Sequence, residues 1–306
     1  MTMLPADTYV QPGAVDPVLD NATVMRLVRA HVPRASAVTA IDESGGEART
    51  YMVDDDLVLK TQRPQQLRAR TSLEKEVRFL RAIAAETDVP APRVLGYGRD
   101  GSTEYTVMSR IPGVAAVTLP VEGEARLRLL RAVGGVLRRV HRIHQEPFVA
   151  DPSFPGIRTV ADFENRLEAT FARSVALLNQ QPELWPWSEA PQTLASRVLA
   201  MQRPNVELVA LHSNPGPEHI FVDPHTLELT GIIDFGDAYV GHPAFDMRWP
   251  RPEDREALLT GYGRRSDDAI PAWLACTILA DMTTIAARPD RRAAARQTLE
   301  AILETL

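Results

Sequence analysis

The chain has almost no cysteine, no evident secretion signal and no long apolar run. Cys276 is the single cysteine among 306 residues, so no internal disulfide can form and we expect a reducing compartment, the cytoplasm. The first residues contain no basic stretch followed by an apolar one, so we expect no signal peptide. The most apolar stretch, residues 272–287, is interrupted by Asp281 and is too short to span a bilayer, which predicts a buried helix.

Lysine is nearly absent as well. Lys60 and Lys75 are the only lysines among 34 basic residues, and the other 32 are arginines. Lys60 ends the apolar run 57–60, which matches a strand pattern whose final lysine holds phosphates. A compact ammonium fits between phosphate oxygens and a carboxylate where a planar guanidinium does not. The alternative is a solvent-exposed lysine at the end of a strand.

Neither sign of charge dominates the composition. The net charge is −6, with 44 % apolar and 24 % charged residues, which is typical of a globular protein and argues weakly against non-specific nucleic-acid binding. Residues 1–20 are rich in Pro and Asp without periodicity and predict a flexible lead. Residues 21–112 predict strands with a helix, and residues 113–306 are mainly helical in pattern. The segment 111–113, Ile-Pro-Gly, marks the boundary.

One carboxylate lies on the apolar face of a predicted helix. A capping box at residues 71–74 predicts a helix that runs to about Ala85, and apolar residues at helical spacing form a stripe on it. Glu76 belongs to that stripe. A carboxylate facing the core needs a cationic partner or must stay protonated, so we expect an ion pair with Lys60. The alternative is that Glu76 lies at the edge of the stripe in water.

Two linked motifs follow in the helical region. His212 is followed two residues later by Asn214 and five residues after that by His219, and residues 234–236 are Asp-Phe-Gly. The kinase signature consists of H-R-D, an Asn five residues after that Asp, and D-F-G further on. The spacing is kept, but Asn214 stands at the position of the catalytic aspartate. The sequence therefore predicts a phosphate site in which the group expected to receive the acceptor's proton is an amide.

Three blocks at residues 212–223, 231–238 and 241–246, with Lys60 upstream, resemble the aminoglycoside phosphotransferase family. That family includes macrolide phosphotransferases and is related to choline kinases and protein kinases. The resemblance implies an α+β, bilobal protein-kinase-like fold, with a small β-rich N-lobe and a larger, mainly helical C-lobe. It also implies that ATP or GTP binds with Mg²⁺ between the lobes, and that the γ-phosphoryl is transferred to a hydroxyl of a small molecule.

The resemblance implies a role for each matched residue. The residues implied in nucleotide binding are Lys60, Glu76, Ser44, Gly45, Gly46 and the hinge residues Met108, Ser109 and Arg110. Asp234 matches a Mg²⁺ ligand, and His219 stands where most members have Asn as the second ligand; the alternative is a His that packs within the loop. His212, Asp237 and Asp246 match positions that support the loop. The turn at 44–46 lacks the full G-x-G-x-x-G spacing, so a plain β-turn is an equal alternative.

Asn214 leaves three explanations open. An amide can orient a hydroxyl but cannot hold its proton at neutral pH, and general-base assistance is typically worth roughly 10²–10⁴-fold. Phosphoryl transfer relies more on positioning and charge neutralisation, so we expect impaired rather than abolished transfer. The chain is a kinase with an Asp→Asn change, a natural pseudokinase that binds without turnover, or an enzyme in which Glu218 or His212 is the base. A scaffold protein that inherited the fold is a separate alternative.

The acceptor is less determined by the sequence. Acidic residues between Asp162 and Glu189 are candidates for a surface that binds a polycationic antibiotic, and the alternative is a solvated helix face. Trp185, Trp187 and Trp249 are candidates for contact with an apolar macrolide or for the core. We expect a small-molecule acceptor, with a cationic antibiotic as one candidate, and no nucleic-acid, membrane or protein partner.

Overall fold

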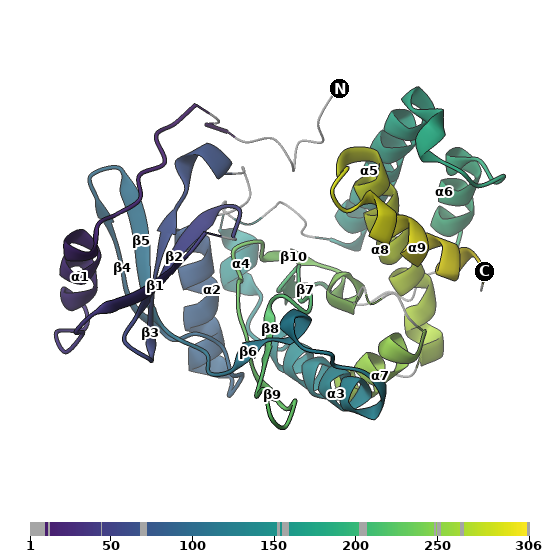
Figure 1. Ribbon diagram of the computed structural model, residues 1–306. Helices are drawn as coiled ribbons and strands as arrows, with labels where there is room; N and C mark the ends of the chain where they lie inside the picture. The colour runs from purple at the N-terminus through teal and green to yellow at the C-terminus, as the bar shows by residue number, and fades with distance from the viewer. Residues whose placement is uncertain are drawn as a thin grey trace.

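The structure is a computed structural model, and it has a sheet-rich part and a helix-rich part side by side (Figure 1). It describes residues 10–11, 13–43, 45–67, 72–151, 154, 159–201, 207–247, 249, 252–263 and 266–304. Within these residues, no helix combines the length and the apolar character that crossing a membrane requires.

Five antiparallel strands form the sheet of the N-lobe, in the order β1-β2-β3-β5-β4. They are β1 (Val38–Asp42), β2 (Ala48–Val53), β3 (Leu57–Gln62), β4 (Val94–Asp100) and β5 (Thr103–Ser109). Buried and half-buried residues alternate along β2 and β3, so each strand has two distinct faces. Leu59 packs with the apolar residues of α1 (Asn21–Arg29) on one face. Lys60 and its cross-strand partner Thr50 therefore point to the other face.

The helix α2 (Leu73–Glu86) carries Glu76 toward this second face. It begins after Ser72, whose hydroxyl accepts a hydrogen bond from the Lys75 amide at 3.0 Å. The predicted capping box began one residue earlier, at Thr71, which lies outside the described residues. The predicted apolar stripe is buried, and Glu76 within it is only 2 % exposed.

The chain leaves β5 through residues 110–113 and enters two small sheets of the C-lobe. One contains β6 (Val114–Ala115), β8 (Ile220–Val222) and β9 (Leu229–Ile232), and the other contains β7 (Val209–Leu211) and β10 (Tyr239–Gly241). Gly113 has a φ of +90°, and a Cβ there would lie 2.2 Å from the Val222 carbonyl oxygen, so this turn requires glycine. The strands β7 and β8 flank the first motif loop, residues 212–219, and β9 and β10 flank the second, residues 233–238. Because β7 pairs with β10 and β8 with β9, the strands hold the two motif loops together.

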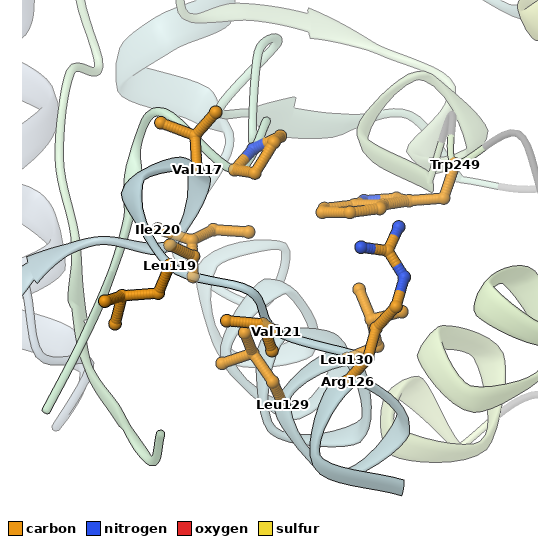
Figure 2. A pocket seen from close by; sticks show the side chains of 10 residues that line it. Val117, Leu119, Val121, Arg126, Leu129, Leu130, Ile220 and Trp249 are labelled. Atoms are coloured by element: carbon orange, nitrogen blue, oxygen red, sulfur yellow. The ribbon is translucent and has the colours of Figure 1, made fainter. Parts of the chain in front are cut away.

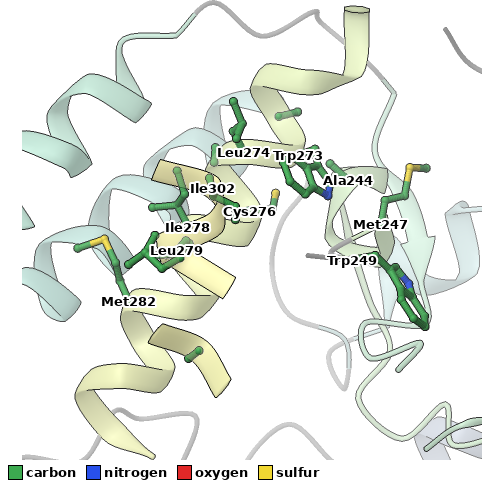
Figure 3. Close-up of a cluster of buried hydrophobic side chains, with 14 of the residues drawn as sticks. Ala244, Met247, Trp249, Trp273, Leu274, Cys276, Ile278, Leu279, Met282 and Ile302 are labelled. Carbon is green, nitrogen blue, oxygen red and sulfur yellow. The ribbon is translucent and has the colours of Figure 1, made fainter. Parts of the chain in front are cut away.

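Seven helices in the described residues build the rest of the C-lobe. They are α3 (Gly123–Val140), α4 (Glu146–Ala150), α5 (Val160–Gln180), α6 (Pro191–Leu199), α7 (Pro252–Tyr262), α8 (Ser266–Ala287) and α9 (Arg292–Leu303). Short 3-10 turns occur at η2 (Pro64–Gln66), η3 (Ala116–Thr118), η4 (Pro182–Leu184) and η5 (Pro243–Met247). The predicted buried helix at 272–287 is the main part of α8, and its side chains form the core with residues of η5 and α9 (Figure 3).

Glycine permits the closest helix crossing, between α3 and α7, which lie side by side in Figure 1. A Cβ on Gly134 would lie 2.0 Å from the Leu258 carbonyl oxygen, and one on Gly261 would lie 1.9 Å from the Arg131 carbonyl oxygen. The two backbones are therefore in direct contact at this crossing.

The stretch 1–20, for which a flexible lead is predicted, contacts the N-lobe in its described part. The amide of Val10 donates to the Leu67 carbonyl, and the amide of Leu19 donates to the Tyr51 hydroxyl at 2.8 Å. Asp16 forms buried ion pairs, described below. Residues 1–9 and Pro12 lie outside the described residues, and the flexible lead stays a prediction.

Candidate active site

Lys60 bonds to one carboxylate from each lobe. Its Nζ donates to Glu76 Oε2 at 2.8 Å and to Asp234 Oδ1 at 2.9 Å. Asp234 lies 174 residues after Lys60 in the chain, on the loop that follows β9. Glu76 also accepts the backbone N–H of Phe235 at 3.2 Å, so α2 contacts the same loop. The structure thus brings together Lys60, predicted to bind the phosphates, its predicted partner Glu76 and the predicted metal ligand Asp234.

The charges of these three groups depend on one another. Burial alone would lower the pKa of Lys60, but Asp234 and Glu76 outweigh it, so the pKa of the ammonium is raised. Burial would raise the pKa of Asp234, but Lys60 and His219 hold it below its usual range. Burial raises the pKa of Glu76, and Lys60 only partly offsets this effect. At neutral pH the cluster therefore keeps a charged ammonium beside an ionised Asp234, whose side chain is 42 % exposed.

His212 connects the two motif loops at their backbones. Its Nδ1 accepts the Asn214 amide at 3.2 Å, and its Nε2 donates to the Ile233 carbonyl oxygen at 2.8 Å. The ring is fully buried and packs against Phe235, with ring centroids 4.5 Å apart. Burial lowers the pKa of this imidazole, which is neutral with both nitrogens in use. His212 therefore cannot serve as the base.

Asp246 accepts hydrogen bonds from the backbone of the loop, and it has a partner that the sequence did not reveal. Its carboxylate accepts the backbone N–H groups of His212 at 2.8 Å and Ser213 at 2.6 Å. The missed partner is His141, at the end of α3, whose Nε2 lies 2.9 Å from Asp246 Oδ2 and whose Nδ1 lies 2.8 Å from the Tyr262 hydroxyl. Burial would raise the pKa of Asp246, but these hydrogen bonds and the nearby imidazoles hold it below its usual range.

Asp237 differs from this pattern. It was matched to a loop-supporting position, but in the described part of the chain its side chain forms no hydrogen bond or ion pair. It follows Gly236 on the loop between β9 and β10 and is half-buried. The loop-supporting role of Asp237 stays a prediction, whereas His212 and Asp246 do form hydrogen bonds with the loop backbone.

His219 and Asp234 form the candidate metal site. The Nδ1 of His219 donates to the Asn214 carbonyl oxygen at 2.8 Å, because a carbonyl can only accept. This leaves Nε2 facing Asp234 Oδ2 at 3.3 Å. Two such groups fit a cation between them, and the carboxylate is the kind of oxygen ligand that Mg²⁺ prefers. No cluster of three His, Cys, Asp or Glu suited to a metal occurs among the described residues, so phosphate and water oxygens would have to complete the coordination.

Asn214 lies on a loop with unusual backbone geometry. Ser213, immediately before it, has a φ of +80°, and Asp234 on the neighbouring motif loop has a φ of +68°. Non-glycine residues seldom adopt this left-handed conformation, and they often do so at functional sites. Asn214 is half-buried, and its side chain forms no hydrogen bond with another described residue. Glu218, four residues later, folds back until its Oε2 would lie 2.6 Å from a Cβ on Gly216.

The hinge offers a different backbone donor from those predicted. The Ser109 amide donates to the Arg93 carbonyl at 2.9 Å, and the Arg110 amide donates to the Asp56 carbonyl at 2.8 Å. Neither N–H is therefore available to a base. The next amide, that of Ile111, donates to none of the residues that the structure describes. Met108 is buried between the lobes, as a residue lining the back of a cleft would be.

The turn between β1 and β2 lies beyond the end of β3 that follows Lys60. Thr50 pairs with Lys60, and Ala48, at the end of the turn, pairs with Gln62. Gly45 and Gly46 are in this turn, and Ser44 lies outside the described residues. The Gln66 side chain lies 3.8 Å from the position of a Cβ on Gly46.

Several residues predicted to bind the acceptor have structural contacts of their own. Asp162 caps α5 in a capping box with Thr159, and Glu189 pairs with Arg197 at 2.8 Å. Trp185 and Trp249 are at most 9 % exposed and belong to the core. Trp249 also borders a pocket of about 230 Å³ beside the motif loop, lined by Pro217, Ile220 and apolar residues of η3 and α3 (Figure 2). None of Lys60, Asn214 and Asp234 lines this pocket.

Comparisons with known proteins agree with this geometry. The model of the phosphotransferase enzyme family matches residues 38–276. An aminoglycoside 3'-phosphotransferase of Streptomyces fradiae is 31 % identical over 201 residues, which cover 59 % of this chain and 69 % of that protein. A streptomycin 3''-kinase of Streptomyces griseus is 29 % identical over 150 residues, covering 48 % of this chain and 53 % of that protein.

Solved structures share the fold at lower identity. The GDP complex of an aminoglycoside 2'-phosphotransferase-IIIa superposes with a TM-score of 0.68 at 16 % identity, over 94 % of this chain and 100 % of that one. The macrolide 2'-phosphotransferase MphH from Brachybacterium faecium superposes with a TM-score of 0.65 at 19 % identity, over 90 % of this chain and 97 % of that one.

Proposed function

Since the chain belongs to the phosphotransferase enzyme family, we propose that it binds ATP or GTP with Mg²⁺ in the cleft at Lys60. We further propose that the γ-phosphoryl is transferred to a hydroxyl of a small-molecule antibiotic. The observation that carries the proposal is the position of the Lys60 ammonium, 2.8 Å from Glu76 and 2.9 Å from Asp234. In phosphoryl transfer such a lysine, held by a helix carboxylate, binds phosphate oxygens beside the metal carboxylate.

Each residue of the site has a part in this proposal. Glu76 orients the Lys60 ammonium toward the phosphates, and Asp234 and His219 hold the metal ion. When bound, Mg²⁺ neutralises the charge that develops on the transferred phosphoryl group. His212 and Asp246 fix the backbone of the loop, so that the Asn214 side chain is presented to the acceptor hydroxyl. Because an amide cannot take up a proton at neutral pH, the proton of the acceptor hydroxyl passes to water or to a carboxylate other than residue 214.

Glu218 is the remaining candidate for that carboxylate on the motif loop. His212 is excluded because both of its nitrogens bond to backbone groups. The Glu218 side chain is half-buried and forms no ion pair with the residues that the structure describes. A natural pseudokinase is the second candidate function, and the amide at position 214 is the observation that favours it.

The base of the nucleotide is expected at the hinge. The Ile111 amide is the available donor in this segment, because those of Ser109 and Arg110 already donate within the N-lobe. The structural relatives include complexes with GDP and with ADP, so both purines are retained in the proposal. The named relatives act on aminoglycosides and macrolides, which are the acceptor classes to test first.

Nucleotide binding tests the proposal independently of turnover. The melting temperature should rise with Mg²⁺–ATP or Mg²⁺–GTP, and Lys60→Ala should abolish the rise because the phosphates lose their cation. Lys75→Ala is not a suitable control, since Lys75 is buried in α2. Arg99→Ala, on the exposed surface of the same lobe, is the matched control and should retain the rise. An identical rise for Lys60→Ala would contradict the proposed site.

A further inference from the structure

A segment before the first helix lies against the end of the sheet where β1 turns into β2. Residues 13–19 precede α1, and we refer to them as the strap (Figure 1). Two of its backbone groups are bonded to β2: the Leu19 amide donates to the Tyr51 hydroxyl at 2.8 Å, and the Pro17 carbonyl accepts from Arg49 at 2.9 Å. The strap is therefore part of the folded N-lobe rather than a free tail.

Asp16 of the strap bonds to two arginines that lie on different strands. Its carboxylate accepts two hydrogen bonds from Arg49 of β2, both at 3.2 Å. It also accepts one from Arg63, just after β3, at 3.0 Å. The side chains of Asp16 and Arg49 are only 7 % and 3 % exposed, so these pairs are shielded from water. Truncating one partner of such a pair leaves an uncompensated buried charge, which is strongly destabilising locally.

The same two arginines hold the turn between β1 and β2. Arg49 donates from Nε to the Glu43 carboxylate at 2.7 Å. Arg63 donates to the carbonyl oxygens of Gly45 at 3.2 Å and Glu43 at 3.5 Å. Hydrogen bonds thus connect the strap through Arg63 to the backbone of the turn and through Arg49 to the side chain of Glu43. The planar fork of each arginine fixes the direction of these bonds as well as their length.

The position of the turn matters because the adjoining strands carry Thr50 and Lys60 on one face of the sheet. Arg49 lies in the buried face of β2, while its neighbour Thr50 shares the cleft face with Lys60. The Asp16 cluster therefore contacts the turn from the buried face of the sheet, and phosphates bound by Lys60 would lie on the opposite face. A turn without side chains at Gly45 and Gly46 can approach phosphate oxygens closely, but only if its backbone is held in place.

We propose that Asp16 is a positioning residue for nucleotide phosphates, which acts through Arg49 and Arg63 to fix the β1–β2 turn at the end of the sheet that follows Lys60. The inference rests on the proposed function, since it concerns the same cleft. It assigns to the strap a role in triphosphate binding and none in binding the purine base, because the hinge lies at the far end of β5.

Calorimetric binding of Mg²⁺–ATP and of adenosine separates this role from a merely structural one. For Asp16→Asn, we expect affinity for Mg²⁺–ATP to fall by about tenfold while affinity for adenosine is unchanged. The matched control is Asp100→Asn, which removes an exposed ion pair with Arg26 elsewhere on the same lobe. The control should bind both ligands as the unmodified chain does. Nucleotide affinity is measured instead of turnover, because turnover depends on the amide at Asn214 and nucleotide binding does not.

The outcomes are distinct. Unchanged Mg²⁺–ATP affinity in a folded Asp16→Asn protein, or an equal loss for adenosine, would overturn the inference. If Asp16→Asn does not fold, Arg63→Gln is the second variant, because it removes the bonds to the turn but keeps the pair between Asp16 and Arg49. Unchanged Mg²⁺–ATP affinity in this variant, or an equal loss of adenosine affinity, would likewise overturn the inference. If the unmodified chain does not bind Mg²⁺–ATP at all, the proposed function itself fails, before any variant is compared.

Discussion

His212 and Ile233 are bonded across the two motif loops: the ring Nε2 donates to the carbonyl oxygen at 2.8 Å. The same ring accepts the Asn214 amide on its other nitrogen. One neutral imidazole thus holds the loop that bears Asn214 against the loop that bears Asp234. A protonated ring could no longer accept the Asn214 amide, so the bond is sensitive to pH.

Stability should fall in mild acid because of this histidine. The pKa of His212 is lowered by burial, so between its native pKa and its unfolded value of about 6.5 the unfolded state binds more protons. The free energy of unfolding is then constant above that window and falls as pH decreases through it. The pKa of Asp246 is also lowered, so its contribution is present above about pH 4 and is lost further down.

Urea titrations at a series of pH values check this expectation. His212→Gln should be less stable at pH 7.5, and its free energy of unfolding should depend less steeply on pH as the pH falls below about 6.5. His225→Gln, in an exposed turn, controls for the loss of a histidine. Equal slopes for His212→Gln and the unmodified chain would count against the neutral buried ring.

Restoring a carboxylate at position 214 should restore turnover. For Asn214→Asp we expect kcat to rise by about 10²-fold or more with an accepted aminoglycoside or macrolide, because the carboxylate can take up the hydroxyl proton. A coupled assay of ADP or GDP release with a panel of both antibiotic classes measures it. No gain with any acceptor supports the pseudokinase alternative.

Glu218→Gln separates the two remaining explanations. If Glu218 is the base, the unmodified chain is already active, Glu218→Gln lowers kcat by about 10²-fold, and Asn214→Asp adds little. If Asn214 replaces the true base, Glu218→Gln has a small effect. Both variants are to be compared at saturating nucleotide, so that a change in binding does not mask the result.

The metal preference should depend on His219. Imidazole is a softer ligand than an amide oxygen, so His219→Asn should favour Mg²⁺ over Mn²⁺ in nucleotide binding. The measurement is the affinity for ATP in each metal, expressed as a ratio. His144→Asn, on the exposed surface, is the control. An unchanged ratio would indicate that His219 packs within the loop and does not touch the metal.

Two adjacent glycines of α3 provide a matched pair for stability. Gly134→Ala should destabilise the protein by about 1–3 kcal/mol or more, because the new Cβ would lie 2.0 Å from the Leu258 carbonyl oxygen. Gly135→Ala meets its nearest atom at 3.8 Å, so it should be neutral or stabilising by up to about 1 kcal/mol. Thermal unfolding of both variants tests whether α3 and α7 touch at the backbone. Equal effects would contradict the crossing.

The predicted α+β, bilobal kinase-like fold is confirmed, and local chemistry explains why the sequence could reveal it. Lys60 is recognisable because lysine is rare in this chain, and Glu76 because a carboxylate interrupts an apolar stripe. The structure brings both to Asp234, although the functional roles of these residues remain predictions.

Long-range partners could not be predicted in the same way. His141 contacts Asp246 from 105 residues away, and nothing in its own surroundings signals that contact. The strap has no periodic pattern, and its order depends on Asp16 meeting two arginines that only the folded sheet brings together. The Ile111 amide donates to none of the described residues, and this depends on which hinge N–H groups the N-lobe already uses.

The contact between Lys60 and Asp234 bears on the order in which ligands bind. The Lys60 ammonium lies 2.9 Å from Asp234 Oδ1, so a Mg²⁺ ion at this carboxylate would compete with a cation that the chain itself holds in place. A nucleotide offers that ammonium new anionic oxygens, which releases Asp234. The metal is therefore expected to arrive with its nucleotide rather than ahead of it, and millimolar Mg²⁺ alone should leave the melting temperature unchanged.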